Sequence, residues 1–214
     1  MNQTAAPIAF AGSTLRSHRH VCAFFTSAAE ESRAMLPYMT DGLTQGERIF
    51  HTIDHGPGQD LIAGLRSVGI DVDAAQRTRQ LEMPTPQETY MRGGRFDPDA
   101  MLALVREVLD SSPDLGFSLT RLSAHVDWVV ANWSSANDWV EYETRLNQLL
   151  PRYDDPVICA YDCDTLGAGM AMDVLRTHPV VIIGGMLQEN PFFVQPDELL
   201  REIDGRRAQE QHSS

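Results

Sequence analysis

The sequence predicts an α/β fold of three layers, in which a mostly parallel central sheet carries helices on both faces. Two observations lead to this prediction. Short apolar runs, which are typical of buried parallel strands, alternate along the chain with segments that have the periodicity of helices. The chain has 214 residues and is 43% hydrophobic and 22% charged, so one domain with a substantial core is expected.

The domain is expected to span residues 18–204. Residues 1–17 are mostly small or polar and lack periodicity, and the tail 205–214 reads GRRAQEQHSS. We expect both ends to be flexible arms, because neither carries a pattern that would hold it on a core.

Strands and helices are expected to alternate between these arms. The expected strands lie at 20–26, 48–53, 80–83, 117–123, 156–161 and 180–183. The expected helices lie at 27–44, 58–68, 136–150 and 165–176, with a further one opening at Asp97-Pro98.

Local signals indicate where the helices begin. Ser27 can cap the first helix, and Glu30 follows at the spacing of a capping box. Asp97 can cap a later helix, where Pro98 fits the first turn and a regular apolar face follows.

Glycine and proline indicate where elements end. Gly69 is a natural stop for the second helix. Pro84 turns the third strand into a loop, and Pro151 stops the helix before the fifth strand. The pair Gly184-Gly185 ends the last expected strand.

The charge balance argues against direct binding to nucleic acid. The chain has 17 Lys+Arg against 30 Asp+Glu, a formal net charge of -13. A surface of this sign repels the phosphate backbone, which nucleic-acid binders neutralise with basic side chains. The acidic excess instead favours solubility and would suit a basic protein partner.

Other features predict a cytoplasmic protein without a membrane anchor. No apolar run approaches the roughly 20 residues needed to span a bilayer, and the start MNQTAAPIAFAG lacks the pattern of a signal peptide. Three cysteines give no disulfide framework, so the thiols are expected to be reduced.

The first strand-to-helix turn has none of the residues of a phosphate-binding loop. It reads TSAAEES over 26–32, without glycine or lysine, and its two glutamates would repel a triphosphate. The strand at 117–123 runs into Ala124 and His125 instead of an acidic magnesium ligand. No G-x-S-x-G elbow is present either. We expect no catalytic residues, no cofactor and no enzymatic activity.

A small-molecule site is expected where the strands run into loops, because ligands of open α/β sheets bind there. Polar side chains would orient the ligand, and aromatic ones would exclude water. The candidate ligand-binding residues are His20, Phe25, His125, Trp128, Tyr161 and Cys163. Trp139 and Tyr142, three apart on a helix, are expected to pack on the sheet.

A metal site is the alternative use of the thiols and imidazoles. Its potential ligands are His20, Cys22, Cys159, Cys163 and His178. Simple burial explains Cys22 and Cys159 better than ligation, because free cysteine behaves as a small hydrophobic residue. Cys163 lies beyond its strand and is the better candidate for a ligand-facing thiol. No metal site is therefore predicted.

An ordered set of motifs resembles the MEDS family, the methanogen/methylotroph DcmR sensory domain. The matching pieces are HVCAFF at His20, GERIF at Gly46, GRFDP at Gly94, Trp128, YETRLNQLLP at Tyr142, ICAYD at Ile158, DVLRTHPVVIIGG at Asp173 and ENPFF at Glu189. Together they cover about 18–195, nearly the whole chain. The chain departs from the family pattern at Ala124 and His125, where a glycine and an acidic residue are expected.

The resemblance implies a RecA/KaiC-like core that has lost its nucleotide loop. It also implies a sensory role in prokaryotic signalling, with a simple hydrocarbon derivative as ligand. Family members are usually joined to output modules, so this chain is expected to act through a separate kinase, anti-sigma factor or transcription regulator.

Three alternatives remain open at this point. One is a protein-interaction regulator without a ligand, its pocket filled by its own side chains. Another is a degenerate nucleotide-binding RecA-like protein, and a third is an enzyme with metal or thiol chemistry. Apolar residues in ENPFFV could also pair two subunits into a homodimer.

Overall fold

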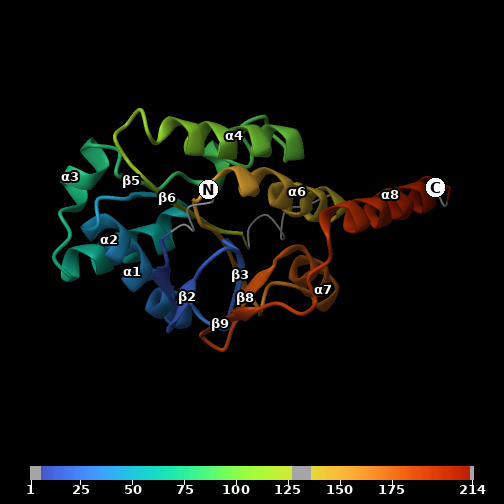
Figure 1. The fold of residues 1–214 in the computed structure, drawn as a ribbon, viewed down its shortest axis with the longest axis horizontal. Helices are drawn as coiled ribbons and strands as arrows, with labels where there is room; N and C mark the ends of the chain where they lie inside the picture. The colour runs from blue at the N-terminus through green and yellow to red at the C-terminus, as the bar shows by residue number, and fades with distance from the viewer. Residues whose placement is uncertain (1–5, 127–135, 213–214) are drawn as a thin grey trace.

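A computed structural model describes residues 6–126 and 136–212 (Figure 1). Its strands are β1 Ile8–Phe10, β2 Ser13–Leu15, β3 His20–Phe25, β4 Arg48–Thr52, β5 Leu81–Glu82, β6 Thr120–His125, β7 Val157–Asp162, β8 Val180–Ile183 and β9 Met186–Glu189. Its helices are α1 Ala28–Thr44, α2 His55–Ser67, α3 Val72–Arg77, α4 Pro98–Ser111, α6 Ala136–Leu149, α7 Ala168–Thr177 and α8 Pro196–His212, with short 3-10 helices at Pro86–Glu88 and Leu150–Arg152.

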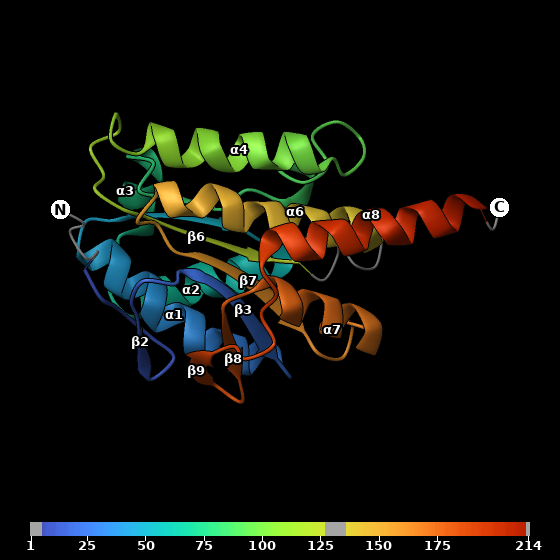
Figure 2. The same cartoon turned by 45° about the vertical axis from the view of Figure 1, so that its right-hand side comes forward.

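The central sheet has the strand order β5-β4-β6-β7-β3-β8-β9, and every pairing except β8 with β9 is parallel. Helices cover both of its faces (Figure 2). One core lies between the sheet and α1 and α2, and the other lies between the sheet and α4, α6 and α7. The predicted three-layer fold with a mostly parallel sheet is confirmed.

Alternation along the central strands divides their side chains between the two cores. Val21 and Ala23 of β3 pack on the α1 side, whereas Cys22 packs on the α6 side. The parallel register sets Cys22 beside Cys159 of β7, so both thiols lie under α6. Polar residues at alternate positions of β3 and β7 therefore lie on the α6 side of the sheet.

The predicted helix starts are confirmed. The Ser27 hydroxyl accepts from the backbone N–H of Glu30, and the Asp97 carboxylate accepts from the backbone N–H groups of Asp99 and Ala100. These side chains satisfy backbone donors that the first turn of a helix leaves without partners.

The prediction of a flexible arm over 1–17 is wrong for residues 8–15. This segment forms the hairpin of β1 and β2, whose apolar side chains Ile8, Phe10 and Leu15 are buried in the core on the α1 side. Its two-residue turn, Ala11-Gly12, has positive φ at both positions, as a tight hairpin turn requires. The turn has alanine where asparagine or aspartate is usual, so the sequence did not indicate a hairpin here.

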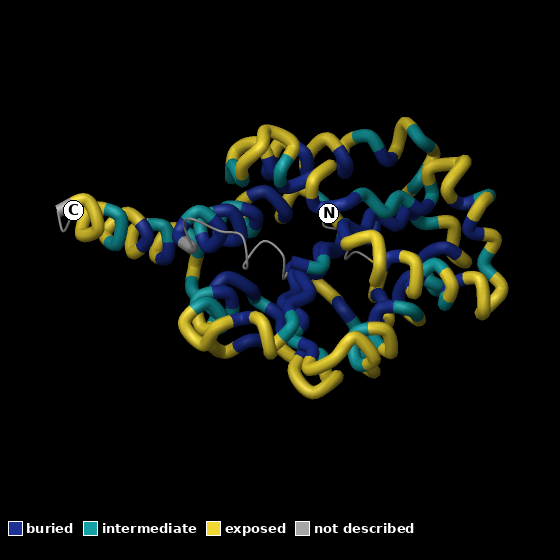
Figure 3. Tube along the Cα trace, turned by 180° about the vertical axis from the view of Figure 1, so that it is seen from behind, coloured by how far each residue is buried: buried dark blue, intermediate teal, exposed yellow. Residues whose placement is uncertain are grey.

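The prediction of a flexible tail over 205–214 is wrong as far as His212, because α8 continues to that residue. The first half of α8 packs Leu199 and Ile203 against Val140 of α6. Figure 3 shows that the far half of α8 is mostly exposed, and Figure 2 shows it extending beyond the body of the domain. An ion pair of 2.8 Å between Arg206 and Asp173 holds this half to α7.

Strand β9 and helix α3 were not predicted either. The strand β9 follows β8 through Gly184-Gly185, which is a hairpin turn instead of a simple end. Helices α3 and α8 also lie where no helix was expected. No helix in the described ranges combines the length and apolar character needed to cross a membrane.

Asp155 gives the fold a pH-dependent element. Burial raises its pKa to about 6 from the usual 3.8, while its carboxylate accepts from the backbone N–H of Thr120 at 2.5 Å. Because the folded state keeps a proton that the unfolded state has released, this group destabilises the fold as pH rises from about 4 to about 6.

We expect the Asp155→Asn variant, which keeps the accepting oxygen, to gain melting temperature relative to the unchanged chain as pH rises from about 4 to about 7. Parallel Tm-against-pH curves for the two proteins, measured by differential scanning calorimetry, would show that Asp155 is not the source of this dependence.

Candidate functional site

Helix α6 carries one acidic residue into the core. Trp139, Tyr142 and Leu146 form its buried apolar stripe, and Glu143 falls within that stripe at four residues from Trp139. The Glu143 side chain is 0% exposed. A carboxylate in this position is costly to bury unless partners surround it.

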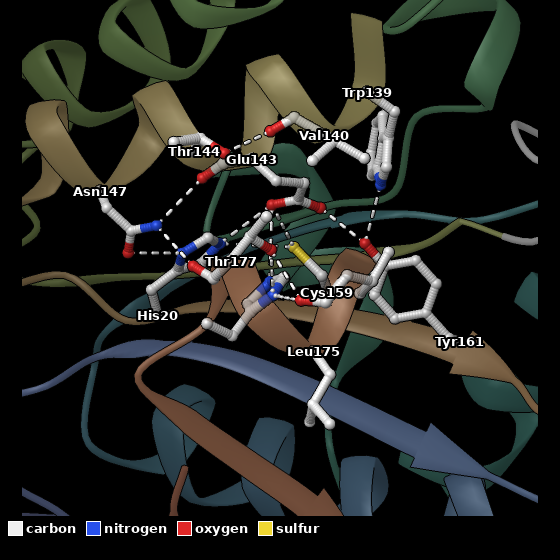
Figure 4. A network of polar contacts seen from close by, with 12 residues as sticks. His20, Trp139, Val140, Glu143, Thr144, Asn147, Cys159, Tyr161, Leu175 and Thr177 are labelled. Atoms are coloured by element: carbon white, nitrogen blue, oxygen red, sulfur yellow. Dashed lines mark hydrogen bonds and ion pairs between the residues drawn. The ribbon is translucent and has the colours of Figure 1, made fainter. Parts of the chain in front are cut away.

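Four side chains meet around this carboxylate, and we call them the polar cluster: His20, Glu143, Cys159 and His178. Their potential ligand atoms all lie within 4.8 Å of one another. The Glu143 Oε2 atom lies 3.1 Å from His20 Nε2, 3.5 Å from His178 Nε2 and 3.6 Å from Cys159 Sγ. All four residues are buried. Figure 4 shows Glu143 extending from its helix toward His20 and Cys159.

Neighbouring groups fix how both imidazoles are turned. The Asn147 amide nitrogen donates to the backbone oxygens of Glu143 and Thr177, so its carbonyl oxygen faces His20 Nδ1 at 3.0 Å. His178 Nδ1 lies 2.9 Å from the backbone oxygen of Val174 and 2.7 Å from the Thr177 hydroxyl, which itself donates to that backbone oxygen. Both Nδ1 atoms therefore face carbonyl oxygens and act as donors, which leaves each Nε2 directed at Glu143.

The electrostatics of the polar cluster favour an ionised Glu143. Burial opposes its charge, but the two histidines and the Tyr161 hydroxyl outweigh burial and lower the pKa of this carboxyl. Burial, then the proximity of His20, lowers the pKa of His178 to about 3, so this imidazole is neutral at neutral pH. Burial and the neighbouring Glu143 raise the pKa of the Cys159 thiol, which keeps its proton.

An aromatic wall adjoins the polar cluster, and we call it the aromatic cluster: Tyr90, Phe96, Trp139 and Tyr142. Its ring centroids lie 5.0–6.4 Å apart in the contacting pairs. Tyr161 joins the two clusters, because its hydroxyl donates to Glu143 at 2.7 Å and accepts from the Trp139 indole at 2.9 Å (Figure 4). The prediction that Trp139 and Tyr142 pack on the sheet is confirmed.

The turn between β3 and α1 is closed by its own carboxylate. Only two residues, Thr26 and Ser27, separate the strand from the helix. The Thr26 backbone N–H and hydroxyl donate to Glu30 at 2.8 and 2.6 Å. A carboxylate thus takes donors that a phosphate-binding turn presents to its anion.

The structure separates the predicted ligand residues. His20 and Tyr161 come together, since both contact Glu143. Phe25 lies in the other core, on the α1 side, because it is an odd number of positions along β3 from His20. The predicted single group of side chains is therefore wrong for Phe25.

The remaining predicted ligand residues lie at or beyond the strand ends. His125 ends β6 and lies 3.1 Å from the Glu31 carboxylate of α1. Cys163 is exposed just after β7, where its backbone N–H donates to the oxygen of Phe25. Trp128 lies outside the described residues.

The structure also brings together only some of the potential metal ligands named from the sequence. His20, Cys159 and His178 belong to the polar cluster, whereas Cys22 and Cys163 do not. Glu143 was not predicted at all. The signal that could have found it is a lone acidic residue at a core position of an amphipathic helix, within the motif YETRLNQLLP.

A separate groove of about 490 Å³ lies beside β4, β5 and α4. Its walls include Arg48, Glu82 and Ser111, which already bond to one another through the Arg48 guanidinium. None of the predicted ligand residues that the structure describes lines this groove.

Comparison with known proteins first defines the class of fold. The structure is similar to a KaiC-like protein from the hyperthermophilic archaeon Pyrococcus horikoshii OT3, with a TM-score of 0.54 and 12% identity. The similarity covers 77% of this chain and 69% of the archaeal chain. The molecule is thus an α/β domain of KaiC-like fold.

The family follows from the sequence comparison. The model of the family described as "MEthanogen/methylotroph, DcmR Sensory domain", or MEDS, matches residues 19–179. The chain belongs to the MEDS family. It is 24% identical over 177 residues to the transcriptional repressor DcmR of Methylorubrum extorquens (strain DSM 6343 / CIP 106787 / DM4). The match covers 82% of this chain and 64% of the repressor's length. The family match and the similarity to a repressor both support a sensory and regulatory role.

Proposed function

We propose that this domain binds a small, largely apolar molecule and passes the signal to a separate regulator in the cytoplasm. The ligand would lie where the aromatic cluster meets the polar cluster, next to Tyr161. The aromatic rings would hold its apolar part and exclude water, and the polar groups would orient it. A simple hydrocarbon derivative fits this combination.

The proposal depends on one observation, the burial of the Glu143 carboxylate among polar partners. A fully buried carboxylate joined to two imidazoles, a thiol and a tyrosine is an expensive arrangement in a core. Such groups gather where a protein binds or transforms something, more often than where it only packs. The hydrogen bond through Tyr161 connects this group directly to the aromatic cluster.

Helix α6 offers a route from the site to the surface. The helix that holds Glu143 also packs Val140 against Leu199 and Ile203 of α8. Arg207, further along α8, pairs with Asp138 of the same helix at 2.6 Å. A ligand that favours one position of α6 would shift the projecting α8, since packed helices move as units.

The output and the lack of catalysis are part of the same proposal. The relative named as a transcriptional repressor supports a regulatory output, which here would pass through another protein. The Glu30-closed turn supports descent from a nucleotide-binding ancestor whose phosphate loop was lost. The domain would then sense its ligand without transforming it.

The test is a thermal-shift screen of the purified chain against one-carbon and halogenated compounds. A ligand at about 100 times its Kd is expected to raise Tm by about 5–10 °C. The Trp139→Phe variant, which keeps a ring but loses the indole N–H, is expected to respond less. Tyr153→Phe, which removes a hydroxyl that donates to Asp110 on the surface, serves as the matched control.

A screen in which no compound shifts Tm would contradict ligand binding and favour the protein-interaction regulator. A response that Trp139→Phe and Tyr153→Phe share equally would move the ligand away from the aromatic cluster.

A further inference from the structure

We propose that the polar cluster is a binding site for a divalent transition-metal ion, with zinc as the best match. The ligands are His20 Nε2, Glu143 Oε2, Cys159 Sγ and His178 Nε2. This site does not depend on the small-molecule ligand proposed above.

Four of the six distances within the polar cluster match the edges of a zinc tetrahedron, and the other two, from His178 Nε2 to His20 Nε2 and to Cys159 Sγ, lie within 4.8 Å. Zinc–ligand bonds of about 2.0–2.3 Å at tetrahedral angles place nitrogen and oxygen ligands about 3.3 Å apart, and sulfur about 3.6 Å from either. The oxygen–nitrogen separations are 3.1 and 3.5 Å, to His20 and His178. Cys159 Sγ lies 3.6 Å from Glu143 and 3.8 Å from His20.

The lone pairs of both imidazoles point to the place where the ion would lie. When Nδ1 donates to a carbonyl oxygen, the neutral form of each ring has an unprotonated Nε2 that can bind an ion. Metal-binding histidines are oriented in this way by the group on their other nitrogen. In His20 that group is Asn147, and in His178 it is the backbone oxygen of Val174.

His178 supplies a second, independent observation. Its Nε2 atom is buried and has no hydrogen-bond partner within the described residues. A buried imidazole nitrogen is rarely left in this state. It is directed at the Glu143 carboxylate at 3.5 Å, and two acceptors that face each other need a proton or a metal ion between them. A proton on His20 would serve one contact of the cluster, whereas a metal ion would serve all four side chains.

The donor set selects the kind of metal. One thiolate, two imidazoles and one carboxylate suit zinc, and magnesium or calcium would require oxygen ligands throughout. On binding, the Cys159 thiol releases its proton to solvent and its sulfur bonds the ion. The thiolate and carboxylate then balance the two positive charges, so the buried site is neutral as a whole.

A zinc ion with four protein ligands has a closed coordination shell, which is typical of structural sites. It would fasten α6 to β3, to β7 and to the segment before β8, in which His178 lies. Zinc would then set the position of α6, the helix that carries both the aromatic cluster residue Trp139 and the contact with α8.

The experiment uses the full chain, freed of metal by a chelator and then titrated. We expect one equivalent of zinc per chain by elemental analysis, together with a rise in Tm. Cobalt, which takes the same ligands, is expected to give the visible bands of a tetrahedral ion and a sulfur-to-metal charge-transfer band. A chain that takes up no zinc above the level of a metal-free blank, or cobalt spectra without the sulfur band, would overturn the proposal.

Two cysteine variants form a matched pair. Cys22 and Cys159 are register partners on neighbouring strands, both fully buried and on the same face, but only Cys159 belongs to the polar cluster. Cys159→Ala is expected to lose the sulfur band and the tight binding, whereas Cys22→Ala keeps both. Loss of the band in Cys22→Ala and its survival in Cys159→Ala would also overturn the assignment.

A milder variant covers the case in which Cys159→Ala does not fold. Asn147→Ala keeps all four ligands, removes the side chain that orients His20 and its two hydrogen bonds to backbone oxygens, and is expected to weaken zinc binding about 10–100-fold. Unchanged affinity in this folded variant would contradict the predicted role of His20. Zinc uptake and the organic-ligand screen are measured separately, so a negative result for one proposal does not contradict the other.

Discussion

Replacing Glu143 by alanine is expected to lower the free energy of unfolding by about 3–5 kcal/mol, measured by urea denaturation of the chelator-treated chain. The substitution removes the shared partner of His20, Cys159 and Tyr161, all of which stay buried. Each of them then loses a contact that water cannot replace, which is why the effect exceeds that of a single hydrogen bond.

Glu141 provides the matched control, two residues away on the same helix. Its carboxylate pairs with Arg145 at 2.9 Å and with Arg207 at 2.6 Å, but it lies at the surface, with 19% of the side chain exposed. Glu141→Ala is expected to lose only about 0–1 kcal/mol. Similar losses for the two variants would mean that the polar cluster contributes no more than a surface ion pair.

Replacing Trp139 by alanine is expected to lower the free energy of unfolding by about 3–5 kcal/mol, again measured by urea denaturation. Trp139 is 0% exposed and contacts the aromatic rings of Tyr90, Phe96 and Tyr142. The truncation leaves a cavity in a close-packed core and removes the indole donor to Tyr161.

Two variants test whether the loss comes from the buried ring. Trp139→Phe keeps most of the aromatic contact and is expected to lose clearly less than Trp139→Ala. Phe192→Ala truncates an aromatic side chain that is 58% exposed and is expected to change stability by about 0.5 kcal/mol or less. A small loss for Trp139→Ala would be irreconcilable with a packed aromatic cluster.

Much of the fold could be predicted because its signals are local. Apolar runs marked the strands of the parallel sheet, and Ser27 and Asp97 marked helix starts that the structure confirms. The hairpin over 8–15 was missed because its turn uses alanine, and its burial depends on a core built by residues far along the chain. The helix α8 was missed because most of its surface is polar and its buried apolar residues in the cluster with α6 are Leu199 and Ile203.

The candidate site could be predicted only in part, because its members are distant in sequence. His20 and Tyr161 were predicted from their strands, but nothing local connects either of them to Glu143. Phe25 was grouped with His20 although the alternation of β3 sends the two to opposite faces. That alternation was available in the sequence, and applying it would have removed Phe25 from the group.

The sequence by itself determined the layered α/β fold, the family and the absence of glycine and lysine from the turn at 26–32. Each of these depends on residue types or on spacing along the chain. Only the tertiary structure decided that His20, Glu143, Cys159 and His178 share one buried place. Their meeting depends on parallel register between β3 and β7 and on how α6 packs over them, and both result from contacts between segments far apart in the chain.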